Sequence, residues 1–204
     1  MGRGDVADVI LDGVTSLATD TGFDTWTRVS RAPILARTDA EPFGTGSAHA
    51  LLEDGRWRLW YTAFLRWGES DADHRHYYVI RHADSDDGIH WRRSEHVCID
   101  NAGADEYAIG RPSVLRLGDT YHMWYVHRGE QYRIGYAHSP DGISWTRRDD
   151  LAGIDVGPDR WDSTAICYPH VFEHDGALYM LYCGNEYGRG GLGLAPTPLD
   201  VAHT

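Results

Sequence analysis

Acidic side chains stand just ahead of three segments of this sequence that alternate like β-strands, and these are the groups best able to move protons. Glu41, Glu106 with its neighbour Asp105, and Asp162 occupy these places. Two carboxylates that face one substrate can divide the roles of acid and base between them. A carboxylate at such a position can instead cap a turn or a strand end, and this structural role is the alternative for each.

Three histidines, His49, His127 and His170, suggest two further kinds of chemistry. Imidazole nitrogens are common metal ligands, so the three could together hold a divalent metal. They could equally supply the acid and the base for an isomerisation, an elimination or a cyclisation. None of them lies in a local ligand motif, and a purely structural histidine is the alternative in each case. The sequence itself requires no cofactor.

Arg111, Arg128 and His170 could together bind an anion. A guanidinium presents a planar fork of N–H donors that matches the oxygens of a phosphate or a carboxylate. Such a site would suit a phosphorylase-like reaction or a nucleotide sugar. The alternative is a salt bridge from Arg111 to Asp105 or Glu106.

A threefold internal repeat is expected to position these side chains. The repeated segments are 47–64, 111–128 and 168–185. Their alignment places Tyr61, Tyr125 and Tyr182 at one position. Each segment begins with an apolar run, passes a polar turn and continues with alternating polar and apolar residues. This is the pattern of a half-buried β-hairpin.

A second unit follows the first two hairpins, over residues 77–94 and 132–149, and each copy contains S-x-D-G-I-x-W. The Asp-Gly pair favours a tight turn, because glycine accepts positive φ and Asp can bond to the turn backbone. Trp91 and Trp145 then open the next strand and are expected to pack under the turn. Each repeat is thus predicted to be a four-stranded meander, the content of one propeller blade.

The third repeat lacks the strand that carries the tryptophan, and the N-terminal region contains a match for it. Residues 21–35 resemble the D-G-I-S-W-T-R-R stretch, with Trp26 in the tryptophan position. We therefore predict an all-β fold in which one domain, 1–204, is a small β-propeller of three four-stranded blades closed by the N-terminal strand. Helical spacing of apolar residues predicts a short helix within 5–20. The blades are expected at about 43–100, 107–150 and 163–200.

The composition argues against several classes of partner. The net charge is −12, so we expect neither nucleic acid nor an anionic membrane surface as a partner. No run of 18 apolar residues occurs, and the N-terminus lacks a signal-peptide pattern.

Cys98, Cys167 and Cys183 form no C-x-x-C pair and cannot all pair within one chain. A cytoplasmic location is therefore expected.

The S-x-D-G-I-x-W turns, the R-P-S-V-L strand followed by Tyr-His-Met-Trp-Tyr, and the final L-G-L-A resemble the glycoside hydrolase superfamily that includes families 32, 43, 62, 68 and 130. The resemblance covers about residues 21–200. It implies a β-propeller with a sugar site in a central funnel. That superfamily is known for five blades, so three would be a departure. It also has its base Asp on the first inner strand, where this sequence has Ser47 and His49.

The resemblance further implies a pair of carboxylates on either side of a glycosidic bond. Asp162 and Glu106 would take these roles, one protonating the leaving oxygen and the other activating water or attacking. Arg111, Tyr168 and His170 would then bind sugar hydroxyls.

These patterns favour a carbohydrate-active enzyme that acts on a small sugar or sugar-like metabolite at a polar central site. A non-hydrolytic isomerase, lyase or cyclase and a non-catalytic carbohydrate-binding module stay open as alternatives. A homodimer built on the N-terminal helix is a further expectation. The candidate catalytic residues are Asp162, Glu106, His170 and His49. The candidate substrate-binding residues are Arg111, Tyr168, Ser113, His127, Arg128, Glu186 and Trp161.

Overall fold

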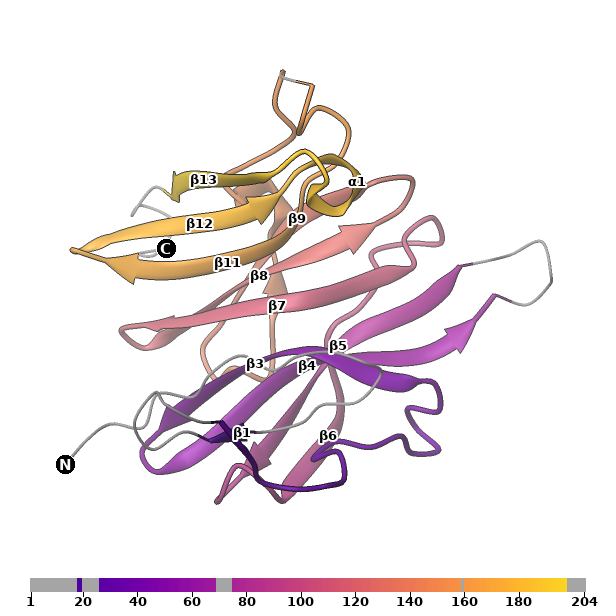
Figure 1. Cartoon of the computed structure of the whole chain (residues 1–204), viewed down its shortest axis with the longest axis vertical. Coiled ribbons are helices and arrows are strands. Elements are labelled where there is room, and N and C mark those ends of the chain that lie inside the picture. Colours follow the sequence, from indigo (N-terminus) through magenta and orange to yellow (C-terminus); the bar gives the residue numbers. More distant parts are fainter. Residues whose placement is uncertain (1–17, 20–25, 69–74, 159, 198–204) are drawn as a thin grey trace.

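The computed structural model describes residues 18–19, 26–68, 75–158 and 160–197, and almost all of its regular structure is β-strand (Figure 1). The helical elements in this part of the chain are a 3₁₀ turn, η1, and a four-residue turn, α1. The elements are β1 (Ala18–Thr19), β2 (Thr27–Arg28), β3 (Gly44–Glu53), β4 (Arg56–Trp67), β5 (His76–Ser85), β6 (Trp91–Ile99), β7 (Ala108–Leu117), β8 (Thr120–Arg128), β9 (Tyr132–Ser139), β10 (Thr146–Arg147), η1 (Asp149–Leu151), β11 (Cys167–His174), β12 (Ala177–Cys183), α1 (Asn185–Gly188) and β13 (Leu192–Thr197).

The strands form three antiparallel meanders that follow one another along the long axis of the molecule (Figure 1). The first runs through β3, β4, β5 and β6, the second through β7, β8, β9 and β10, and the third through β11, β12 and β13. Asp-Gly pairs make two of the hairpin turns. Asp54 and Gly55 both have positive φ, as do Asp175 and Gly176. Positive φ at both positions is the type I′ geometry that matches the twist of paired strands.

The S-x-D-G-I-x-W segments form the expected turns, and one of them also joins two meanders. Asp141 Oδ1 accepts hydrogen bonds from the amides of Ile143 and Ser144, at 2.8 and 2.7 Å, and the Trp145 indole donates to the Gly142 carbonyl at 3.0 Å. The same carbonyl accepts a bond of 2.7 Å from the Trp60 indole. The turn of the second meander is therefore fixed against the first.

Apolar side chains fill the spaces between successive meanders. Between the first and second lie Trp60, Ile80, Ile109, Met123 and Tyr125, and between the second and third lie Trp124, Tyr136, Ile166, Val171 and Met180. Two buried hydroxyls link the strands directly. Thr62 Oγ1 accepts a bond from the Arg111 amide at 3.2 Å, and Ser113 Oγ accepts one from the Val171 amide at 2.9 Å. The Ser113 side chain thus connects β7 to β11 by a hydrogen bond.

The first strand of every meander contains a bulge at the same repeat position. Ser47, Arg111 and Tyr168 have φ values of 39°, 54° and 58°, and the pairing register shifts at each of them. Side chains other than glycine adopt positive φ at an energetic cost, and such residues gather at functional sites. The repeat therefore gives three equivalent places where a side chain is turned away from the regular alternation of the strand.

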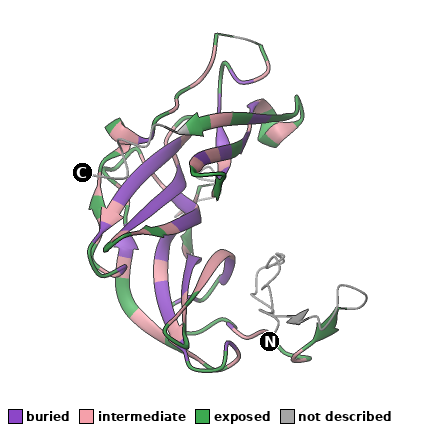
Figure 2. Cartoon of the chain, turned by 90° about the vertical axis from the view of Figure 1, so that its left-hand side faces the viewer, coloured by how far each residue is buried: buried purple, intermediate pink, exposed green. Residues whose placement is uncertain are grey.

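The predicted ring closure is wrong for the described residues. β2 pairs with β1, and β13 has β12 as its one partner in the described ranges. The reason is local anchoring: Thr45 Oγ1 donates to the Leu35 carbonyl at 2.9 Å, and Leu35 packs in the core of the first meander. Trp26 is half exposed rather than packed under a turn. Figure 2 shows the three meanders as an open, curved stack.

The helix expected within 5–20 falls almost wholly outside the described residues, which include only β1 from that range. Among the described elements, no helix has the length and apolar character needed to cross a membrane.

Candidate functional site

Two arginines and four tyrosines gather where β7 and β11 begin and β8 and β12 end. We call this group the arginine–tyrosine mouth, and its members are Tyr107, Arg111, Arg128, Tyr132, Tyr168 and Tyr187. The bulge positions of the second and third meanders supply Arg111 and Tyr168. The guanidinium of Arg111 lies 4.3 Å from the centre of the Tyr168 ring. A cation held over an aromatic face is attracted by the ring and fixed in orientation.

Arg128 is held by the other tyrosines of the mouth. Its guanidinium lies 5.0 Å from the Tyr132 ring and 5.6 Å from the Tyr107 ring, and it contacts the Tyr187 hydroxyl at 3.5 Å. The Tyr132 hydroxyl bonds that of Tyr78 at 2.7 Å, which ties the mouth to the first meander. Burial raises the pKa of Tyr168 to about 12, so its hydroxyl stays neutral and can donate a hydrogen bond at physiological pH.

A cavity of about 390 Å³ opens at the mouth. Its lining residues are Arg128, Gln131, Tyr132, Thr164, Ala165, Cys167, Asn185, Glu186 and Tyr187. A second cavity of about 250 Å³ shares Asn185 and Glu186 with it and includes Trp161. The turn between the two cavities has positive φ at Glu186 and Tyr187. Three residues named as substrate-binding candidates, Arg128, Glu186 and Trp161, therefore line these two cavities. Arg111 is linked to the larger one through Tyr168, whose ring stacks on Tyr187.

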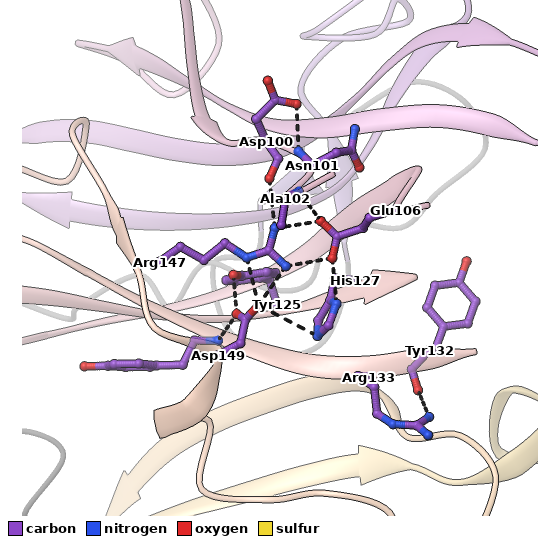
Figure 3. A network of polar contacts seen from close by, with 11 residues as sticks. Asp100, Asn101, Ala102, Glu106, Tyr125, His127, Tyr132, Arg133, Arg147 and Asp149 are labelled. Atoms are coloured by element: carbon purple, nitrogen blue, oxygen red, sulfur yellow. Dashed lines mark hydrogen bonds and ion pairs between the residues drawn. The ribbon is translucent and has the colours of Figure 1, made fainter. Parts of the chain in front are cut away.

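Glu106 lies elsewhere, in an ion-pair network of the second meander (Figure 3). Its carboxylate accepts bonds of 2.7 Å from both terminal nitrogens of Arg147 and one of 2.7 Å from His127 Nδ1. Arg147 also pairs with Asp149 at 2.7 Å. Burial alone would raise the pKa of Glu106, but the bonds from Arg147 and His127 outweigh it and lower the pKa to about 2. Glu106 is therefore ionised at neutral pH and is bound by Arg147 and His127.

Asp162 is buried against its own meander. Its Oδ2 accepts a bond of 3.1 Å from the Tyr182 hydroxyl, and Gly157 passes so close that a Cβ there would lie 2.5 Å from Oδ1. Asp162 and Glu106 thus belong to separate sets of contacts, and neither lines the cavity at the mouth.

Each meander repeats one structural bond that the sequence alone did not reveal. The aligned tyrosines donate to a buried or half-buried carboxylate: Tyr61 to Glu41 at 2.7 Å, Tyr125 to Asp149 at 2.6 Å and Tyr182 to Asp162 at 3.1 Å. The acidic residues that precede the inner strands therefore have a stabilising role, with Asp149 replacing Glu106 as the tyrosine's partner in the second meander.

The three candidate metal-ligating histidines do not meet. His170 is exposed and stacks on Phe172, while His127 bonds Glu106 and lies 4.0 Å from Asp149. His49 lies on β3, within the first meander. In the ranges that the structure describes, no group of three His, Cys, Asp or Glu side chains is placed to hold a metal. The predicted three-imidazole site is thus not formed there.

His127 nevertheless borders a cavity of its own, of about 530 Å³. The residues lining this cavity are His127, Arg133, Ile134, Asp149, Asp150, Gly153, Ile154 and Asp155. Successive side chains of a strand point to opposite faces, so His127 and Arg128 serve different cavities although they are neighbours in sequence.

Two thiols face each other across β11 and β12 beside the mouth. Cys167 and Cys183 are paired in register, and both are free, as is Cys98. Burial raises the pKa of Cys167 and of Cys98 to about 12, because the thiolate is poorly solvated inside the protein. Both thiols are therefore protonated at physiological pH.

Alkylation should report this protection directly. At pH 8 we expect iodoacetamide to modify Cys98 and Cys167 about a hundredfold more slowly in the native protein than in urea-unfolded protein, because thiolate is the reactive form. Mass spectrometry after timed quenching gives the rate for each cysteine. Equal native and unfolded rates at Cys167 would show that its thiol is open to solvent.

Comparison with known proteins relates the sequence to uncharacterized relatives and the structure to glycoside hydrolases. No protein-family model matches the sequence. Uncharacterized proteins of two Mycobacterium tuberculosis strains, CDC 1551 / Oshkosh and ATCC 25618 / H37Rv, are each 43% identical over 173 residues, which is 85% of this chain and 56% of the relative. The chain thus spans about half the length of the curated relatives that it matches.

Three solved structures show the likeness in fold. A glycoside hydrolase superposes with a TM-score of 0.72 and 20% identity, covering 91% of this chain and 57% of that one. A family 32 β-fructofuranosidase of Bombyx mori gives 0.71 and 16%, covering 95% and 41%. Sucrose-6-phosphate hydrolase of Lactobacillus gasseri gives 0.68 and 16%, covering 89% and 36%. The chain therefore has a glycoside-hydrolase-like, nearly all-β fold.

Proposed function

We propose that this chain is a carbohydrate-active protein that binds a sugar or sugar-like metabolite at the arginine–tyrosine mouth, on three meanders that serve as propeller blades. The observation that carries the proposal is the cavity of about 390 Å³, lined by tyrosines, an arginine and amide groups. Sugar sites combine aromatic faces with hydrogen-bonding groups, and ligand cavities of this size are ordinary. The sugar-cleaving neighbours in fold support the same class of ligand. The free thiols support a reducing compartment such as the cytoplasm.

Glu186 is the carboxylate best placed to act on such a ligand. It lines both cavities, and its side chain is largely exposed and pairs with Arg189 at 2.9 Å. The expected hydrolytic pair consists of Asp162 and Glu106. These two carboxylates make separate internal bonds. The geometry therefore supports binding at the mouth more directly than hydrolysis by that pair.

A second candidate function rests on His127. This imidazole lies between Glu106 and Asp149 at the edge of the cavity of about 530 Å³. A histidine oriented by a carboxylate can exchange a proton with a ligand. This arrangement favours a non-hydrolytic acid–base reaction as the alternative to sugar binding at the mouth.

Saccharide titration tests the main proposal. We expect mono- and disaccharides to change the tyrosine and tryptophan fluorescence of the protein, and Tyr187→Ala to weaken their binding about tenfold through loss of the exposed ring at the cavity. Tyr179→Ala is the matched control, since Tyr179 stacks on Phe172 away from the cavity. Activity on aryl glycosides, compared with Glu186→Gln, then separates an enzyme from a binding module. Equal binding by both tyrosine variants would place the ligand elsewhere.

A further inference from the structure

We propose that the ligand of the mouth is a sugar that carries an anionic group, a phosphate or a carboxylate, held by Arg111 and Arg128. The proposal rests on the proposed function and adds the charge of the substrate class. The two arginines give the mouth a positive charge that no carboxylate contacting them offsets in the described residues.

Ten of the arginines that the structure describes pair with a carboxylate, and the two at the mouth are not among these ten. Paired guanidinium groups are found at Arg56, Arg58, Arg81, Arg92, Arg93, Arg116, Arg133, Arg147, Arg148 and Arg189. Within the described part of the chain, Arg111 and Arg128 contact tyrosine side chains instead. In a protein of net charge −12, two cations that contact tyrosines at the same mouth leave a local positive charge, which a bound anion would balance.

The backbone holds Arg111 ready for such a ligand. Its φ of 54° places it on the bulge of β7, and its guanidinium rests on the Tyr168 ring. A contact with an aromatic ring uses none of the guanidinium N–H donors in a hydrogen bond to a carboxylate. The edge of the guanidinium is the part that binds a phosphate or a carboxylate with two parallel hydrogen bonds.

Arg128 adds a second set of donors that the protein does not use fully. Its Nε is buried and has no hydrogen-bond partner among the described residues. Buried donors are usually satisfied, so one left open beside a cavity is a place for a ligand acceptor. The Tyr132 and Tyr107 rings restrict the guanidinium, which reduces the entropy lost on binding.

The remaining groups at the cavity fit the sugar part of the ligand and do not oppose the anion. Tyr187 offers an aromatic face and a hydroxyl. The Asn185 side chain makes three internal hydrogen bonds, which leave one of its N–H groups to donate. Glu186 is the one carboxylate among the residues lining this cavity, and Arg189 pairs with it at 2.9 Å. The local balance of charge therefore stays positive.

Calorimetric titration of the full chain with matched ligands tests the proposal. The probes are hexose phosphates, hexuronates, the corresponding neutral methyl hexosides and inorganic phosphate, each in gluco, galacto and manno forms where a sugar is present. We expect at least one anionic sugar to bind ten- to a hundredfold more tightly than its neutral counterpart, and this preference to shrink as salt rises. The phosphate and carboxylate series show which anion the site prefers.

Substitutions then locate the preference. Arg111→Gln and Arg128→Gln should each remove most of the preference for the anion, measured as the ratio of the dissociation constants of the neutral and anionic sugars. Arg111→Lys keeps the charge but loses the fork, and should fall between. Arg92→Gln is the control, because Arg92 is exposed and pairs with Asp86 at 2.8 Å. Thermal unfolding of each variant verifies its folding, and the salt dependence of the wild type tests the charge without any substitution.

The outcomes separate this inference from the function on which it rests. Equal binding of neutral and anionic sugars overturns the inference and leaves sugar binding intact. Inorganic phosphate binding as tightly as any sugar phosphate overturns it too, because the arginines would then form a simple anion site. If no sugar of either kind binds to folded protein, the proposed function itself fails.

Discussion

Replacing Glu41 with alanine is expected to lower the free energy of unfolding by about 3–5 kcal/mol, the cost of removing one partner of a buried ion pair. The Glu41 side chain is 1% exposed. It accepts a hydrogen bond of 2.7 Å from Tyr61, pairs with Arg81 at 3.2 Å and also bonds Arg93. Its loss leaves the Arg81 guanidinium and the Tyr61 hydroxyl without this acceptor, and Arg93 keeps only its bond to the Ala36 carbonyl. Urea unfolding followed by tryptophan fluorescence measures the change.

An exposed ion pair provides the control for this experiment. Asp86 pairs with Arg92 at 2.8 Å with both side chains mostly in solvent, so Asp86→Asn should leave the urea midpoint unchanged. Glu41→Gln keeps the shape of the side chain and tests whether the charge itself matters. If Glu41→Ala were as stable as the control, the acidic residue before β3 would have no structural role.

The second large effect concerns acid stability and Glu106. The pKa of this carboxyl is about 2 in the folded protein and has its ordinary value of 4.5 when the chain unfolds. A lowered folded pKa stabilises the protein fully above pH 4.5, and this contribution is lost as the pH falls from there through about 2. The contribution is on the order of 3 kcal/mol. Glu106→Gln cannot ionise and should lack it.

Urea unfolding of the wild type and of Glu106→Gln across pH 2 to 7 tests this prediction. We expect the two to differ most near neutral pH and to converge toward pH 2. Taking the difference cancels the titration of the other carboxylates, such as Asp141, whose pKa is also lowered to about 2. Asp150→Asn serves as the control, since Asp150 is an exposed partner of Arg148. A difference that stays constant with pH would show that Arg147 and His127 do not bind the ionised form preferentially.

Local turns and strand alternation were predictable from the sequence because neighbouring residues determine them. The Asp54–Gly55 turn, the Asp141–Gly142 turn and the indole bond of Trp145 all involve residues within a few positions of one another. The threefold repeat extended these local signals over most of the chain and predicted the all-β fold, while the resemblance of its motifs to glycoside hydrolases predicted the likeness in fold.

Contacts between distant segments were not predictable in the same way. Residues 21–35 look like a fourth strand, yet Leu35 is bound to the first meander by Thr45, and no local pattern reveals that choice. For Glu106 the sequence suggested catalysis, capping or a salt bridge to Arg111, whereas its partner is Arg147, 41 positions away. Tyr187 carried no signal, since its place at the mouth depends on a turn with positive φ rather than on a strand.

The bulges at Arg111 and Tyr168 take these two side chains out of the regular strand pairing. Strand pairing resumes beyond each bulge, at Ser113 and at His170, so the hydrogen-bond ladder does not depend on which side chain occupies the bulge. A substitution there changes what the mouth contacts and leaves the ladder in place. If the mouth binds the proposed ligand, single substitutions at these two positions change its contacts without removing a bond of the regular ladder.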